Sequence, residues 1–179
     1  SYGTSVTETA GIMGGGIQFS YTNTGGGFGV VGPANRVGGL NNMIFGGFGD
    51  FSGLGINLRN NDPRGKTFSV LIKTFSGETY TLPLAETLSA QAALVASDKW
   101  QSFLFCLDCL IGEDGRYIHD TSDILEEGSI AALEIRVSDT AAGSIVVDEL
   151  RLRTQGASFS GRITDNFASE GNYTNAGGT

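Results

Sequence analysis

Asp148 is the residue whose surroundings in the sequence most clearly need a chemical explanation. It lies within the run SIVVDELRLR, which has the alternation of a β-strand. On that alternation Asp148 shares a face with Val146, Leu150 and Leu152, and Glu149 lies on the opposite face. A carboxylate on a buried face is costly unless it is paired, hydrogen-bonded or bound to a cation. We therefore interpret Asp148 as either a structural latch or a metal ligand.

Cys106 and Cys109 form a C-x-x-C spacing. Such a pair serves as a redox centre, as half of a zinc site or as a small local disulfide. Zinc would need two further ligands, and His119 is the only histidine. A thioredoxin-like role would need a βαβ unit, which the pattern does not indicate. We interpret the pair as a structural disulfide or as two partly buried thiols.

The residues that could support catalysis are few. His119, followed by Asp120, is the only histidine that could act as a base for a nucleophile, and its polar loop predicts a solvated side chain. Glu126 and Glu127 are adjacent, and adjacent carboxylates on a turn rarely converge across one glycosidic bond. We therefore expect a protein that is not an enzyme.

Aromatic side chains offer a different chemistry, the binding of sugars. A sugar site needs an exposed aromatic ring flanked by amides and acids that bond hydroxyl groups. We take Tyr80, Tyr117 and Trp100 as the candidate ligand-binding residues. Tyr117 lies in the polar loop 112–122 and is the best candidate for an exposed ring.

The elements that must position these residues are predicted to be β-strands. Apolar and polar residues alternate in short runs separated by Gly, Asn, Asp and Pro. Segment 85–97, rich in alanine, is either a short surface helix or a loop that crosses between sheets. The predicted strands lie at 16–22, 28–32, 54–59, 67–75, 78–82, 99–107 and, as a pair, within 130–153.

Turn residues and apolar faces predict how these strands pair. The sequence NTGGG predicts a hairpin between strand 16–22 and the strand after it, and Ser76-Gly77 predicts a second hairpin. The strands between 54 and 82 would form a meander, and 130–153 a long closing hairpin. Strand 99–107 is apolar on both faces, which predicts a central position in its sheet.

Composition restricts the partners and the fold class. The chain has 28 glycines but 3 prolines, which fits many tight turns within a folded domain. Its 11 Lys and Arg against 19 Asp and Glu give a formal net charge of −8, which disfavours nucleic acid and anionic membranes as partners. No apolar run is long enough for membrane insertion. Acidic chains rich in Gly, Thr, Ser and Asn are common outside cells, so we expect an extracellular or cell-surface protein.

These observations predict an all-β fold, a two-sheet antiparallel sandwich with at most one short helix. The 179 residues suffice for one domain with a tail. We expect the sandwich at residues 1–154, and a linker and tail at 155–179, where the composition becomes polar and glycine-bearing.

Several short motifs follow one another in a recognisable order. A D-F-S-G turn at Asp50 to Gly53 enters a strand, the hairpin FSVLIKTFSGETYTLPL follows, and then come W-Q-x-F at Trp100 and SIVVDELRL. This order, with IMGG at Ile12 to Gly15 and GGF at Gly26 to Phe28, resembles the galactose-binding-like jelly roll of carbohydrate-binding modules and of complex I intermediate-associated proteins. The resemblance covers roughly residues 10–154 and implies a jelly-roll sandwich.

The same resemblance implies roles for two sites. Jelly rolls of this kind often hold a structural calcium ion between an N-terminal segment and the last strand. The matching position is Asp148, with Asp50 or Glu8 as helpers, and the alternative is an Asp148 hydrogen-bonded to the N-terminal strands. Trp100 lies where the family buries its tryptophan, so the resemblance favours a core position for it over stacking on a sugar.

The tail has a second, shorter resemblance. SGRITD, from Ser160 to Asp165, resembles the first strand of a carboxypeptidase-regulatory-like domain. The tail could begin a further module or could pair with a neighbouring subunit, because Phe159, Gly161 and Ile163 alternate as an added edge strand would.

Two functions follow as hypotheses. The first is a non-catalytic extracellular or cell-surface module that binds glycan. The alternative is a structural or adhesive subunit that binds copies of itself and builds a filament or surface layer by strand pairing through its tail or edge strands.

Overall fold

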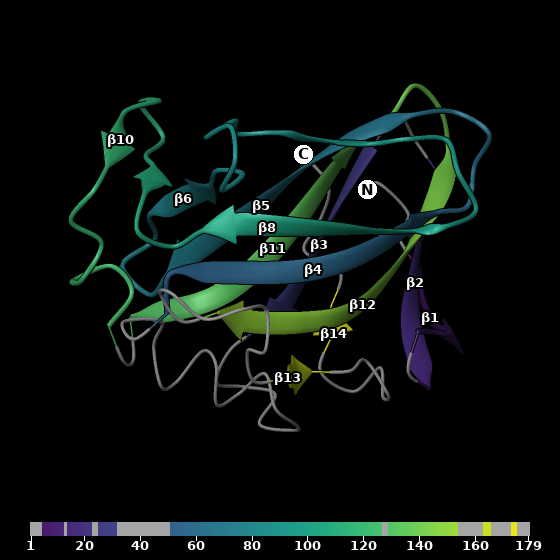
Figure 1. Ribbon diagram of the computed structural model, residues 1–179, viewed down its shortest axis with the longest axis horizontal. Helices are drawn as coiled ribbons and strands as arrows, with labels where there is room; N and C mark the ends of the chain where they lie inside the picture. The colour runs from purple at the N-terminus through teal and green to yellow at the C-terminus, as the bar shows by residue number, and fades with distance from the viewer. Residues whose placement is uncertain are drawn as a thin grey trace.

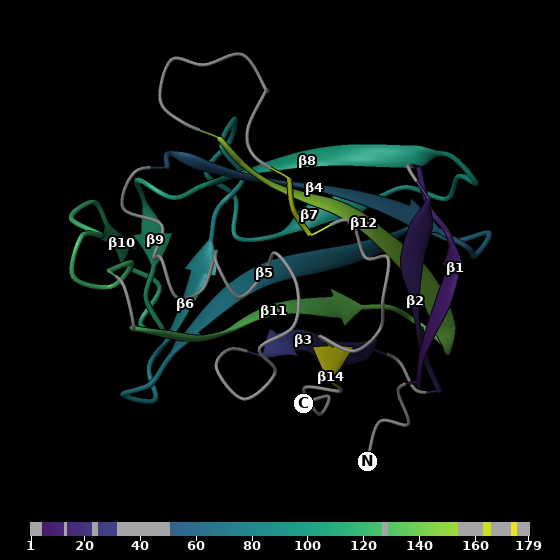
Figure 2. The same cartoon turned by 90° about the horizontal axis from the view of Figure 1, so that it is seen from below.

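The computed structural model describes residues 5–12, 14–22, 25–31, 51–126, 129–153, 163–165 and 173–174. These residues form β-strands and connecting turns, and none of them is helical. The strands pack as two antiparallel sheets that lie in two layers (Figures 1 and 2), which confirms the predicted sandwich. Within the same residues no helix could cross a membrane.

The two sheets are called sheet A and sheet B, and sheet B contains more strands than sheet A. Sheet A runs in the order β1 (Ser5–Ala10), β2 (Gly15–Tyr21), β12 (Gly143–Arg153), β4 (Gly53–Asn60) and β8 (Trp100–Cys106), with β13 (Ile163–Asp165) also paired to β12. Sheet B runs in the order β10 (Tyr117–Ile118), β9 (Leu110–Ile111), β6 (Thr79–Leu82), β5 (Lys66–Thr74), β11 (Ile130–Ser138), β3 (Gly25–Val31) and β14 (Tyr173–Thr174), with β7 (Ala92–Leu94) also paired to β5.

The core lies between the sheets and is built from alternate residues of each strand. The predicted inward faces of β4 and β5 are confirmed, because their alternate apolar side chains are all buried there. Phe68 of β5 meets Phe103 and Phe105 of β8 edge to face, with ring centroids 4.8 Å and 5.9 Å apart. These contacts join the middle of sheet B to the edge of sheet A. The buried alternate residues of β4 and β5 are Leu54, Ile56, Leu58, Phe68, Val70 and Ile72.

Three predicted pairings are wrong, because consecutive strands often belong to opposite sheets. β2 and β3 do not form a hairpin, β4 does not begin a meander with β5, and β11 and β12 do not form the long closing hairpin. Apolar side chains of β2, β4, β5, β11 and β12 lie together in the core. Crossing between the layers lets these side chains meet across the core, whereas a hairpin would set them side by side. The Ser76-Gly77 hairpin between β5 and β6 is confirmed, and Gly77 has the positive φ of 94° that such turns use.

Strand β8 lies at the edge of sheet A, so its predicted central position is wrong. The segment from Pro83 to Ala85 bonds to the outer edge of β8. The Cys106 N–H donates to the Pro83 carbonyl at 2.8 Å, and the Ala85 N–H donates to the Leu104 carbonyl at 2.9 Å. Of the two interpretations of segment 85–97, the loop is correct, and β7 forms within it.

A β-bulge at Asp148 and Glu149 overturns the predicted faces of β12. The register with β4 shifts between Asp148 and Arg151, and Glu149 has a φ of 55°. The alternation therefore changes phase within the strand, as no sequence period can show. Asp148 does not share a face with Leu150 and Leu152; those two leucines lie in the core together with Ile145 and Val147.

The tail and the molecular surface complete the fold. The two short strands of the tail, β13 and β14, pair with β12 and β3 of the same chain.

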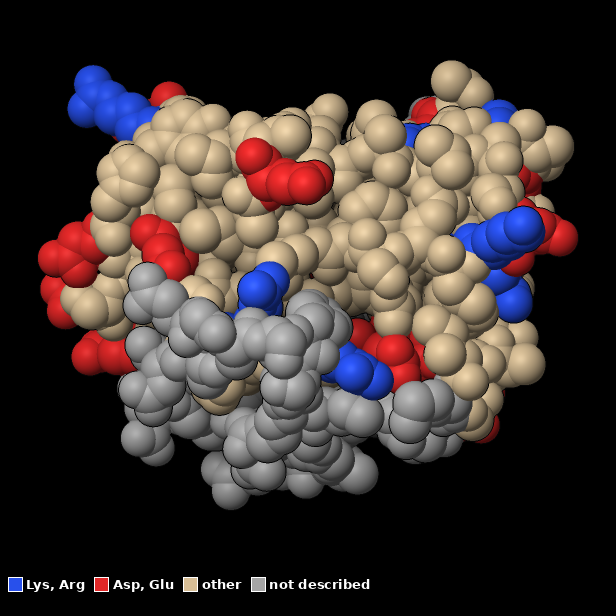
Figure 3. Space-filling model, viewed as in Figure 1, with Lys and Arg blue, Asp and Glu red and all other residues tan. Residues whose placement is uncertain are grey.

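Figure 3 shows the outer face of sheet A, where the surface over β4 and β8 is mostly uncharged and acidic side chains gather at the end that carries β10.

Candidate ligand-binding site

The outer row of β5 and β11 in sheet B consists mainly of small and polar side chains, and Leu71 is a buried apolar exception. The inward positions of β5 and β11 alternate with the outward ones, so the register defines the outer rows. On β3, the positions opposite Arg136 and Glu134 are Gly27 and Gly29. The outward pairs between β5 and β11 are Thr67 with Ser138, Ser69 with Arg136, Leu71 with Glu134 and Lys73 with Ala132.

A buried carboxylate occupies the centre of this face. Glu134 is 2% exposed and is held by two cations, with Lys73 Nζ at 2.7 Å and Arg136 Nη2 at 2.8 Å. Arg136 Nε also donates to Glu134 at 2.9 Å. A guanidinium has five N–H donors, and Glu134 accepts two of them. The trio of Lys73, Glu134 and Arg136 thus carries one net positive charge and presents further donors on the half-buried Arg136 and on Lys73.

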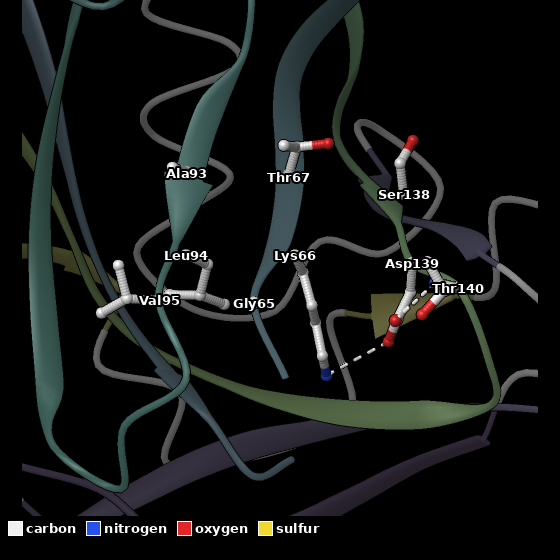
Figure 4. A pocket seen from close by; sticks show the side chains of 9 residues that line it. All are labelled: Gly65, Lys66, Thr67, Ala93, Leu94, Val95, Ser138, Asp139 and Thr140. Carbon is white, nitrogen blue, oxygen red and sulfur yellow. Dashed lines mark hydrogen bonds and ion pairs between the residues drawn. The ribbon is translucent and has the colours of Figure 1, made fainter. Parts of the chain in front are cut away.

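A pocket of about 410 Å³ lies on the same face, next to the row of Ser69 and Arg136. Figure 4 shows Thr67 and Ser138 from the two neighbouring strands at this pocket, with β7 on one side and the turn after β11 on the other. Its volume lies within the range typical of small-molecule sites. The lining residues are Gly65, Lys66, Thr67, Ala93, Leu94, Val95, Ser138, Asp139 and Thr140.

The wall at Asp139 is fixed by a buried ion cluster. Arg64 Nε donates to Asp139 at 2.7 Å, Tyr21 donates its hydroxyl proton to the same carboxylate, and Lys66 Nζ lies 3.7 Å away. Lys66 also pairs with Asp62 at 2.5 Å. Burial by itself raises the pKa of Asp139, but the hydrogen bonds from Arg64 and Tyr21 outweigh it and lower the pKa to about 2. The cluster ties β2 and β5 to the turn before β12, so the pocket is rigid at this end.

The three predicted ligand-binding residues do not come together. Tyr117 lies on β10 opposite Ile111, is 49% exposed, and donates its hydroxyl proton to the Leu88 carbonyl at 2.9 Å. Tyr80 pairs with Ile72, packs against the core, and has a pKa raised chiefly by burial. Figure 1 shows β10 and the beginning of β8, where Trp100 lies, at opposite ends of the molecule.

Trp100 lies on the outer face of sheet A, so the core position that the resemblance favoured is wrong. It pairs with Arg59, whose neighbour Leu58 points into the core. The Arg59 guanidinium carbon lies 5.1 Å from the centre of the indole ring, within the range of a cation–π contact.

Asp148 acts as the predicted latch. Its side chain is fully buried, its Oδ2 accepts the Ile12 N–H at 2.6 Å, and its Oδ1 accepts the Glu149 N–H at 2.8 Å. These bonds fasten the N-terminal segment to β12. A side chain at Gly11 would meet this carboxylate, because an added Cβ would lie 2.4 Å from Oδ2.

Calcium at Asp148 stays a prediction. Among the described residues no three His, Cys, Asp or Glu side chains gather as a metal site. Glu8 is exposed on β1, and Asp50 lies outside the described residues. Both oxygens of Asp148 already accept backbone N–H groups, so the residues at hand do not form a cage for the ion.

The remaining sequence predictions concern thiols and histidine. Cys106 and Cys109 are free thiols, half-buried and buried, and burial raises the pKa of Cys109. This agrees with the second interpretation of the pair. His119 is exposed, as expected for a loop residue.

The comparisons with known proteins define the class of fold. The chain is similar to the family 11 carbohydrate-binding module of a cellulosomal cellulase of Clostridium thermocellum, at a TM-score of 0.54 and 15% identity, covering 86% of this chain and 83% of that one. A structure of such a module from that organism in complex with a β-1,3-1,4-mixed-linked tetrasaccharide gives 0.55 and 14%, over 86% and 84%. An exo-β-agarase gives 0.52 and 12%, over 87% of this chain and 22% of that one.

The fold is therefore a jelly-roll sandwich like that of carbohydrate-binding modules, as predicted. The sequence matches no model of a protein family and no curated protein.

Proposed function

We propose that the chain is a non-catalytic module that binds a neutral glycan on the outer face of sheet B. The observation that carries the proposal is the pocket at Thr67 and Ser138, which lies beside the trio of Lys73, Glu134 and Arg136. The likeness to carbohydrate-binding modules supports it, because one of these similar structures is a complex with a β-1,3-1,4-mixed-linked tetrasaccharide.

The chemistry of this face suits hydroxyl groups. Hydroxyls of Thr67 and Ser138 donate and accept, and Arg136 and Lys73 supply donors that are already oriented by Glu134. The small side chains of Thr67 and Ser138 leave room for a sugar ring to approach the sheet at the pocket. Holding the polar groups in place before binding lowers the entropic cost of association. Since polysaccharides are mainly extracellular, an extracellular or cell-surface location belongs to the same proposal.

The test is binding to a glycan panel that includes β-1,3-1,4-mixed-linked glucan and agarose, measured by affinity electrophoresis and calorimetry. Ser138→Phe should fill the pocket and lower affinity about tenfold or more, since it displaces a ligand without touching the core. Ser138 is exposed, so folding should be preserved.

Thr7→Val on β1, also exposed but on sheet A, is the matched control and should bind like the wild type. If Ser138→Phe and the wild type bind a glycan with equal affinity, the glycan binds outside the pocket at Thr67 and Ser138. Failure to bind any glycan of a broad panel would refute the function itself.

A further inference from the structure

A second groove lies at the end of the sandwich where β4 finishes and β8 begins. It has a volume of about 820 Å³ and lies between the turn after β4 and the loop before β8. Arg59, one of its lining residues, stacks on Trp100, the only tryptophan of the chain. The lining residues are Arg59, Asn60, Asn61, Asp62, Pro63, Ala96, Ser97 and Asp98.

The two walls of this groove are held by buried and half-buried amides. Asn60, 1% exposed, donates from Nδ2 to the Arg64 carbonyl at 2.7 Å and to the Val95 carbonyl at 3.2 Å, and so joins the two loops. Gln101 bonds both backbone groups of Val95, accepting at 3.0 Å and donating at 3.2 Å. A groove fixed in this way loses little conformational freedom when it binds a ligand.

The charges lining the groove select the ligand chemistry. Among the described residues Arg59 forms no salt bridge with a carboxylate, and the exposed Asp98 forms none with a cation, although Lys99 follows it in the chain. The charge of Asp62 is taken up by Lys66. An anion would be repelled by Asp98 and a cation by Arg59, whereas a neutral polyhydroxyl compound can accept from one and donate to the other.

We infer that this groove is a second carbohydrate-binding site, separate from the face of sheet B, in which Arg59, stacked on Trp100, forms part of the wall. The inference rests on the proposed function for the class of ligand. Arg59 donates to sugar hydroxyls, Asp98 accepts from them, and Pro63 and Ala96 supply apolar area beside the sugar ring. A module with two such sites gains avidity for a polysaccharide that reaches both.

The single tryptophan makes the site directly observable. The β-1,3-1,4-mixed-linked tetrasaccharide and agaro-oligosaccharides are titrated while Trp100 fluorescence and calorimetric stoichiometry are recorded. We expect a saturable change in fluorescence that persists in Ser138→Phe, which adds no tryptophan. Arg59→Met retains the stem over the indole but removes the donors, and should weaken this response about tenfold.

Arg116→Met, an exposed arginine near β10, is the control and should leave the response unchanged. No fluorescence change with any glycan of the panel overturns the second site, even if calorimetry shows binding to sheet B. A change that vanishes in Ser138→Phe also overturns it. If Ser138→Phe instead leaves calorimetric binding intact while Arg59→Met removes it, the face of sheet B fails and the second site stands.

Discussion

Two aspartates, one in the turn before β12 and one in the middle of that strand, bury their side chains completely but satisfy them differently. Asp139 is held mainly by side chains, those of Arg64, Lys66 and Tyr21, and joins the two sheets; the Thr140 N–H also donates to it at 2.6 Å. Asp148 is held by the backbone N–H groups of Ile12 and Glu149 and joins neighbouring segments of sheet A. The first arrangement therefore depends on charge, and the second depends on having an oxygen acceptor at the right place.

Asp139→Asn should have the largest effect, because it leaves the fully buried Lys66 with Asp62 as its main carboxylate partner. Breaking a buried ion pair by removing one partner costs about 3–5 kcal/mol, and Asp62, which lies 2.5 Å from Lys66, offsets part of this cost. Urea unfolding followed by circular dichroism measures the loss. A decrease in the free energy of unfolding below about 1 kcal/mol would mean that the cluster is hydrated and not held by charge.

Asp148→Ala should come next. It leaves two backbone N–H groups without their acceptor, each at a cost of about 1–3 kcal/mol. Asp148→Asn keeps one oxygen acceptor and should lose roughly half as much. The same unfolding experiment provides the comparison: the Asn variant should lose less stability at position 148 than at position 139. Equal losses for the two Asn variants would show that both aspartates depend on their charge.

Lowering the pH should distinguish Asp139 further from Asp148. The pKa of Asp139 is lowered from 3.8 to about 2, so this carboxylate stabilises the fold above pH 4 and loses that contribution as the pH falls toward 2. The shift corresponds to about 2 kcal/mol. Wild-type stability should fall over that window, whereas Asp139→Asn should show a shallower decrease. Parallel curves for the two proteins would exclude Asp139 as the source.

The sequence allows the strands and their inward faces to be predicted, but not which sheet each strand joins. Alternation assigns Phe68, Val70 and Ile72 to one face of β5, yet the same pattern is compatible with pairing to β4 or crossing over it. The bulge at Asp148 also has no signature, because it changes the phase of an otherwise regular run.

The candidate site was only partly predictable for the same reason. The spacing of Glu134 and Arg136 places both on one face of β11, a signal that the alternation of LEIRV contains. Their meeting with Lys73 depends on the register between β5 and β11, which arises from packing of the whole sandwich. Tyr80 does not form an exposed platform for a sugar, because its side chain packs against the core.

Calcium should change stability least of all these treatments, and it is the sharpest test of how Asp148 is held. An aspartate whose two oxygens already accept backbone N–H groups has few lone pairs left for a cation that needs six to eight oxygen ligands. We expect the Tm in excess EDTA to match the Tm in millimolar calcium within about 1 °C, in the wild type and in Asp148→Asn alike. A calcium-dependent increase in the wild-type Tm that disappears in Asp148→Asn would instead identify Asp148 as a ligand. Because the N-terminal segment is fastened at Ile12, the same increase would then be accompanied by slower hydrogen exchange of that N–H.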